Sequence, residues 1–295
     1  MLINELHKKG LINPPGFVRG NTHYLTITGS IAYGCEEGYS DFDIYGFCIP
    51  PKEYIFPHLS GEIPGFGKQT EKFDQWQQHR IYDPEAVGGK GREYDFSIYN
   101  IVKYFQLCME NNPNIIGSIF TPQHAVLHST NIGNMVRENR KIFLHKGAWF
   151  KFKGYAYSQI HKMKSQTRIG KRKETVEKYG YDIKFSYHCV RLLNEVEQIL
   201  VEHDLDLQRN REQLKSIRRG EWKLEDITRY FEEKENSLEK IYAESFLRYS
   251  PDENAIKTLL LQCLEEHYGN LKDVVIVEEK AIRILRQIRE LANNY

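Results

Sequence analysis

Two short motifs separated by a polar loop constrain this sequence more than any other feature. The first is Gly-Ser-Ile-Ala-Tyr-Gly at 29–34, and the second is Asp-Phe-Asp-Ile-Tyr-Gly at 41–46. The second motif opens a run of apolar and aromatic residues, so we predict a strand over 41–48. Side chains two positions apart in a strand point to the same side, which places Asp41 and Asp43 together, with the apolar residues between them facing a core. Two neighbouring carboxylates repel each other, and two divalent cations about 3.5–4 Å apart are a common partner of such a pair.

The first motif is predicted to be a tight turn that leads into a short helix, with Gly34 as its cap. Backbone N–H groups at such a turn, together with a hydroxyl, form a natural seat for phosphate. Gly29 and Ser30 are therefore candidate contacts for the phosphates of a nucleotide. The alternative is an ordinary solvated strand end whose acids have no ligand.

A third acid is predicted on a neighbouring strand over 92–99. Asp95 alternates with apolar and aromatic residues there, and a third carboxylate could bind a catalytic metal ion and help to deprotonate an attacking hydroxyl. Glu93 shares the same strand face and is the second choice. An acid that caps a helix or lies on an edge strand is the alternative interpretation of Asp95.

Composition limits the classes of protein that this chain can represent. The 295 residues carry a net charge of +1, so any nucleic-acid or membrane surface must be local. No 18-residue apolar run predicts a transmembrane helix, and the N-terminus lacks a signal-peptide core. Five scattered cysteines without a Cys-x-x-Cys pair argue for a reducing, cytoplasmic location and against a zinc site.

The remaining elements are predicted from periodicity, turns and caps. Residues 52–90 are rich in Gly and Pro and indicate a long loop or insertion, either a lid over the substrate or a disordered segment, with a possible strand near 73–81. A further strand is expected over 23–28. Helices are expected over 2–10, 100–110, 134–166, 224–247, 252–268 and 278–292, with another beginning at Asn112-Pro113 and a strong one near Lys184.

Two groups of cations are candidate binding elements. Lys184, His188 and Arg191 lie at i, i+4 and i+7 of the predicted helix, a spacing typical of an exposed face. The alternative, a contact for nucleotide phosphates, is what the family resemblance described next implies. A basic stretch over 162–178 is either a solvated loop or an arm that binds a triphosphate or an RNA backbone. Its cations are Lys162, Lys164, Arg168, Lys171, Arg172, Lys173 and Lys178.

The Gly-Ser turn, the spacer and the Asp-x-Asp strand resemble the signature of the DNA polymerase beta nucleotidyltransferase superfamily. The order strand, Tyr-Phe-x-Leu, then Asn-Pro-Asn-Ile-Ile narrows the resemblance to the RlaP-type family of minimal nucleotidyltransferases associated with RNA repair. The likeness covers roughly residues 24–200. Gly117-Ser118 stands where that family usually has a Glu in the helix after Asn-Pro, so no site role is assigned to this helix.

The resemblance implies a fold and a reaction. The expected fold is α+β, with a polymerase-beta-like nucleotidyltransferase domain containing a mixed sheet over 1–150 and a mainly helical domain over 151–295. Helices are expected on one face of the sheet. The expected reaction transfers a nucleoside monophosphate from an NTP to an acceptor hydroxyl, with two Mg²⁺ ions (or Mn²⁺) held by Asp41, Asp43 and Asp95. An RNA or tRNA 3′ end is the first candidate acceptor. A protein or small-molecule acceptor and an inactive nucleotide-binding module are the alternatives.

Overall fold

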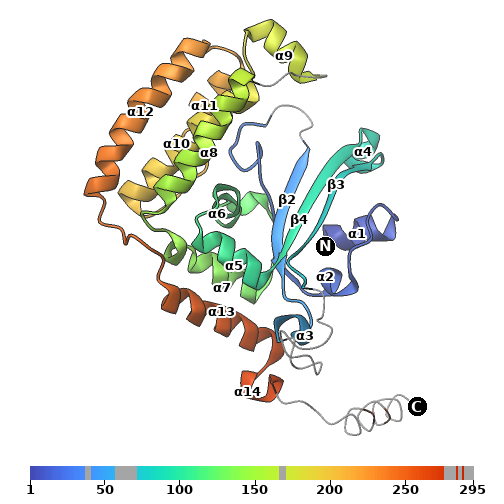
Figure 1. The fold of residues 1–295 in the computed structure, drawn as a ribbon. Helices are drawn as coiled ribbons and strands as arrows, with labels where there is room; N and C mark the ends of the chain where they lie inside the picture. Colours follow the sequence, from blue (N-terminus) through green and yellow to red (C-terminus); the bar gives the residue numbers. More distant parts are fainter. Residues whose placement is uncertain (37–40, 57–71, 166–170, 276–283, 285–287, 289–295) are drawn as a thin grey trace.

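The computed structural model in Figure 1 describes residues 1–36, 41–56, 72–165, 171–275, 284 and 288. The predicted lid lies largely in 57–71, outside the described residues, and so does the predicted helix over 278–292, apart from residues 284 and 288. Among the residues described, no helix combines the length and apolar character that crossing a bilayer requires.

The described strands form one mixed sheet in the order β3-β4-β2-β1-β5. β2 and β4 run parallel, and every other neighbouring pair is antiparallel. The predicted strands are all present, whereas the short edge strand β5 was not expected. The strands are β1 (Thr22–Ile27), β2 (Phe42–Cys48), β3 (Gln75–Asp83), β4 (Arg92–Asn100) and β5 (Val126–Ser129).

Helices make up most of the rest of the described chain. Asn100 and Asn112 cap α5 and α6 with their side-chain oxygens, as the Asn-Pro motif indicates for the second of these helices. The helices are α1 (Leu2–Lys8), α2 (Gly16–Gly20), α3 (Lys52–Ile55), α4 (Ala86–Gly89), α5 (Ile101–Met109), α6 (Pro113–Ile119), α7 (Asn131–Glu138), α8 (Ala148–Ser165), α9 (Lys171–Tyr179), α10 (Ile183–Glu202), α11 (Arg211–Arg218), α12 (Leu224–Glu244), α13 (Glu253–Tyr268) and α14 (Leu271–Val274), with 3₁₀ turns at Gln123–Ala125 and Arg140–Phe143.

Alternation along the strands places apolar side chains on both faces of the sheet. Ile44 of β2 and Phe96 of β4 pack in a small core with Leu6 of α1 and Val18 of α2. The opposite face packs against α5, α6 and the helices that follow them, in a larger core. The expectation that helices cover only one face is therefore wrong, because α1 and α2 cover the other.

The larger core joins the sheet to the long helices. α10 packs against both α8 and α12 (Figure 1). Most of its side chains are buried. Residue 150, the predicted domain boundary, lies inside α8, and the larger core contains residues from both sides of it. The division into two domains stays a prediction.

Candidate active site

Asp43 of β2 and Asp95 of β4 are register partners on adjacent parallel strands. Their even-numbered neighbours Ile44, Tyr94 and Phe96 are buried in the smaller core, so both acids lie on the opposite face of the sheet. Asp41 directly precedes β2 and is exposed to solvent. The structure thus places Asp43 and Asp95 side by side, with Asp41 just before the same strand as Asp43.

The environment of Asp43 disfavours its negative charge. Desolvation by neighbouring protein atoms raises the pKa of Asp43, and the charges of Asp95 and Asp41 raise it further. Lys184 and His79 oppose this shift but do not reverse it. An uncompensated carboxylate among other carboxylates is a position that a bound cation would stabilise.

His79 lies next to Asp95, a contact that the sequence patterns did not predict. A bulge between Gln78 and Ile81 disrupts the pairing of β3 with β4, and Arg80 adopts a left-handed backbone conformation there, with φ of 56°. The Arg80 N–H donates to Asp95 Oδ1 at 2.6 Å, and His79 Nδ1 lies 3.6 Å from the same oxygen. Sequence periodicity gives no signal for this contact, because His79 lies within the bulge of β3.

Gly29 lies directly against the Asp43 carboxylate. Its φ of +70° is in the left-handed region, and a Cβ at this position would lie only 2.7 Å from Asp43 Oδ2. The neighbouring Thr28 donates its N–H to the Asp43 carbonyl at 2.7 Å. Glycine is therefore required both for the turn and for its close approach to the acid.

The segment 29–34 forms consecutive turns, so the predicted short helix is absent. The N–H of Tyr33 donates to Gly29 O at 3.2 Å, and the N–H of Cys35 donates to Ser30 O at 2.8 Å. Gly34 has φ of +62° and ends these turns rather than capping a helix. Ser30 is half-buried at the start of these turns, and its contact with phosphate stays a prediction.

The three predicted cations of α10 do not form one exposed face. Lys184 is exposed and acts electrostatically on Asp43, and His188 is half-buried. Arg191 is buried, and its Nη1 lies 3.1 Å from Glu195 Oε1. Glu195 therefore supplies an anion for the Arg191 charge inside the protein.

The basic stretch includes α9. Lys173 pairs with Glu177 at 3.7 Å, and the Lys178 ammonium lies 4.8 Å from the Tyr179 ring centroid. In Figure 1, α9 lies at the same end of the molecule as the start of β2. Arg168 and the side chains of Lys164, Lys171 and Arg172 fall outside the described residues.

The acids fit a hard divalent cation in their donor chemistry. Carboxylate oxygens are the ligands that Mg²⁺ prefers, and charge crowding around Asp43 is what such an ion would relieve. Within the ranges that the structure describes, no three Asp, Glu, His or Cys side chains lie close enough together to form a complete metal site. The chemistry of these carboxylates fits a divalent cation, and metal binding by them stays a prediction.

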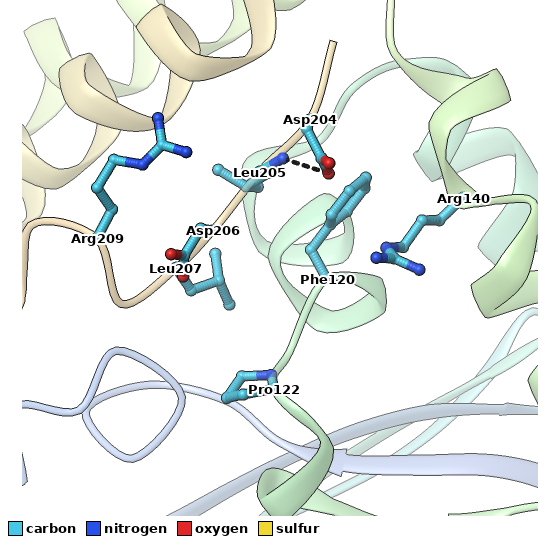
Figure 2. Close-up of a pocket in the computed structure, with 8 residues that line it drawn as sticks. All are labelled: Phe120, Pro122, Arg140, Asp204, Leu205, Asp206, Leu207 and Arg209. Carbon is cyan, nitrogen blue, oxygen red and sulfur yellow. Dashed lines mark hydrogen bonds between the residues drawn. The ribbon is translucent and has the colours of Figure 1, made fainter. Parts of the chain in front are cut away.

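A separate cavity of about 260 Å³ lies between α6 and the segment after α10 (Figure 2). Asp204 and Arg209 line it, but Asp204 pairs with Lys141 at 2.6 Å and Arg209 pairs with Glu202. Arg140 lies over the ring of Phe120 at 5.0 Å. Because these charges are met within the protein, we assign no substrate to this cavity.

The mixed sheet, the helices around it and the position of the acids define an α+β fold of the nucleotidyltransferase type. The chain belongs to the RlaP family, described as the RNA repair pathway DNA polymerase beta family, whose model matches residues 18–248. This confirms the family resemblance carried by the two motifs. The chain is thus a polymerase-beta-like nucleotidyltransferase by family.

Among solved structures, the chain is similar to a nucleotidyltransferase-like protein from Exiguobacterium sibiricum 255-15. The identity is 6%, the match covers 89% of this chain and 74% of that chain, and the TM-score is 0.28. No curated protein matches the chain.

Proposed function

We propose that this protein transfers a nucleoside monophosphate from an NTP to an acceptor hydroxyl and releases pyrophosphate. The observation that carries the proposal is the in-register pair Asp43 and Asp95, with the Gly29 backbone against the Asp43 carboxylate. In the reaction, the acceptor oxygen forms a bond to the α-phosphorus, and the bond from that phosphorus to the pyrophosphate oxygen breaks. Family membership supports this class of reaction.

The acids have distinct proposed roles. Asp41 and Asp43 would hold two Mg²⁺ ions (or Mn²⁺), and Asp95 would share the ion nearest the acceptor. When bound, the ions supply positive charge at the phosphates and make the acceptor hydroxyl easier to deprotonate. Asp95 Oδ1 already accepts the Arg80 N–H, which fixes the direction of this carboxylate.

The remaining predicted residues would bind the triphosphate. Gly29 and Ser30 would donate to the β- and γ-phosphates, and Lys184 and His188 would complement the charge that develops on pyrophosphate. The exposed position of Lys184 and its electrostatic effect on Asp43 support its part in this arrangement. Little covalent chemistry is required of the protein, so positioning and charge supply the rate.

The proposed acceptor is the 3′ hydroxyl of an RNA or tRNA. The description of the family as part of an RNA repair pathway supports this choice, as does the basic stretch over 162–178. A protein hydroxyl and a small molecule fit the same site. A nucleotide-binding module without activity is the alternative from another class.

The test is incubation of the protein with each α-labelled NTP, Mg²⁺ and total RNA or cell lysate, followed by separation of labelled RNA, protein and small molecules. Label on RNA that is lost when the 3′ end is blocked is the expected result. Label confined to protein or to small molecules would show that the acceptor belongs to that class instead of being RNA. The absence of label in every fraction, despite measurable NTP binding, would favour the inactive module. The Asp43→Asn protein is the control for contaminating activity.

A further inference from the structure

A buried group of three side chains connects α10 to the Gly-Ser turn. Arg191 donates from Nη1 to the Tyr33 hydroxyl and, at 3.1 and 3.3 Å, to the two carboxylate oxygens of Glu195. The Arg191 guanidinium carbon lies 4.6 Å from the centroid of the Tyr33 ring. Arg191, Tyr33 and Glu195 are each no more than 5% exposed. A turn near the start of the chain is thus fixed to a helix about 160 residues later.

The region after α10 holds the same turn at other points. Gln208 donates from Nε2 to the carbonyl of Ala32 at 3.2 Å, and the Cys35 thiol donates to the carbonyl of Arg211 at 3.6 Å. A Cβ at Gly34 would meet the Gln208 amide at 3.4 Å. The turn therefore lies between the Asp43 carboxylate on one side and the helical region on the other.

A buried charge pair has a high desolvation cost, and replacing both partners with apolar residues is often neutral or stabilising. Stability alone therefore does not account for this pair at the centre of α10. Such a pair can serve to hold a neighbouring group in one position, and here that group is the Tyr33 hydroxyl. Direct contact of Arg191 with a nucleotide phosphate would require the guanidinium to leave Glu195 and reach the surface.

We infer that Arg191 is a positioning residue that, with Glu195, holds the 29–34 turn in place through the Tyr33 hydroxyl. Its use in placing a triphosphate rests on the proposed function, whereas the anchoring itself does not. The turn amides then point at the phosphates beside Asp43 because α10 keeps them there. The structure thus assigns Arg191 a role through Tyr33 rather than at the nucleotide.

The first test measures amide hydrogen exchange across 29–36 in the full-length protein without nucleotide. Tyr33→Phe removes only the hydroxyl, and we expect the amides of Tyr33, Gly34 and Cys35 to exchange about fivefold faster, as expected for one lost hydrogen bond. Tyr181→Phe is the matched control, because its buried hydroxyl donates to Trp222 O at 2.6 Å, away from the turn. Unchanged exchange in Tyr33→Phe, or equal acceleration in the control, would overturn the inference.

The second test is a double-mutant cycle on NTP affinity. Arg191→Lys keeps a positive charge opposite Glu195 but loses the planar donor aimed at Tyr33. The probe is whichever of the four Mg²⁺–NTPs binds the wild type most tightly. We expect each single change to weaken binding about fivefold and the double change to stay within about twofold of the larger single effect.

The outcome of this cycle distinguishes positioning through Tyr33 from direct contact of Arg191 with the nucleotide. Coupled effects support positioning through Tyr33, because Arg191 then acts only by way of the hydroxyl. Independent effects, which multiply to about 25-fold, would show that Arg191 contacts the nucleotide directly and would overturn the inference. If the wild type bound none of the four NTPs, the proposed function would fail, and hydrogen exchange alone would decide the anchoring.

Discussion

Asp43 and Asp95 are register partners on two adjacent parallel strands, although they lie 52 positions apart in the sequence. A parallel pair needs a crossover connection, and this one contains β3, which pairs with the far side of β4. The bulge of β3 lies beside Asp95, and the Gly29 turn, which precedes β2, lies beside Asp43. The two acids, the Gly29 turn and the Lys184 side chain, which come from distant parts of the chain, therefore lie near one another.

Neutralising the paired acids should abolish activity and spare the fold. Asp43→Asn and Asp95→Asn should each lower turnover by at least about a hundredfold. The melting temperature of Asp43→Asn should stay equal or rise, because the change removes a charge whose environment raises the pKa of the acid. Turnover of labelled NTP and thermal melts measure the two effects. Glu93→Gln, on the same face of β4, is the control, and an equal loss there would reject the assignment of Asp95.

Gly29→Ala should separate backbone strain from loss of the site. Gly29 and Gly10 have nearly the same φ, +70° and +72°, but only a Cβ at 29 would strike the Asp43 carboxylate. Each alanine should cost about 1 kcal/mol of stability through its left-handed conformation. Only Gly29→Ala should also weaken NTP binding, as measured by calorimetry. Equal NTP affinity in both variants would remove the turn from the nucleotide site.

Lys184→Ala should reduce the rise in melting temperature that an NTP with Mg²⁺ produces. Because ligand that binds only the folded state stabilises it, the size of this rise reports affinity. Loss of one charged contact should weaken binding about tenfold. Arg229→Ala, an exposed change on α12, is the control. The same rise in wild type and Lys184→Ala would leave Lys184 as an ordinary surface residue.

Changing 171–173 to alanine should weaken RNA binding and flatten its dependence on salt. Each lost contact with a single-stranded phosphate lowers the salt slope by about 0.7, so three lost contacts lower it by about 2. Filter binding of RNA across a range of salt concentrations gives this slope. The control replaces three exposed cations outside the stretch, Arg229, Lys240 and Lys257. If both triple variants retain the wild-type slope, the stretch is a solvated segment.

Acid should destabilise the protein partly through His23 on β1. Its Nε2 lies 3.0 Å from His267 Nδ1, and burial, then the nearby His267 and His128, lower the pKa of His23 to about 4. The unfolded chain binds this proton near pH 6.5, so the stabilising contribution is complete above that pH and is lost as the pH falls toward 4. Between pH 7 and 5 the loss is about 2 kcal/mol. In His23→Gln, the decrease in the free energy of unfolding between pH 7 and 5, measured by urea unfolding, should be smaller by that amount. An unchanged dependence would show that His23 is not responsible.

Local patterns predicted much of the sheet and its acids. The alternation of apolar residues around Asp43 and Asp95 predicted that each acid lies on a strand. It also predicted that both acids lie on the face opposite these apolar neighbours, because the apolar side chains must pack in a core. The Asn-Pro motif located the start of α6, since a capping side chain and a proline at the first turn act within one helical turn. The family assignment followed from the same short motifs.

Other features depend on contacts that local patterns do not specify. Helical spacing placed Arg191 on one stripe with Lys184 and His188, as an exposed face or a phosphate contact. In the structure the side chain is buried, and Glu195 one turn later is its partner. His79 became part of the site through a bulge whose position depends on the pairing of β3 with β4. α1 and α2 were not expected to cover the second face, because nothing in their short patterns indicates which surface they meet.

The large core that contains residues from both sides of position 150 has a consequence for unfolding. A cut at that position would divide α8, and it would separate α10 from Tyr33. The sheet that carries the acids and the helices that hold the turn should therefore melt in a single cooperative transition. Damage to a distant helix such as α12, which packs on α10, would then lower the population of intact sites without touching any residue at the acids.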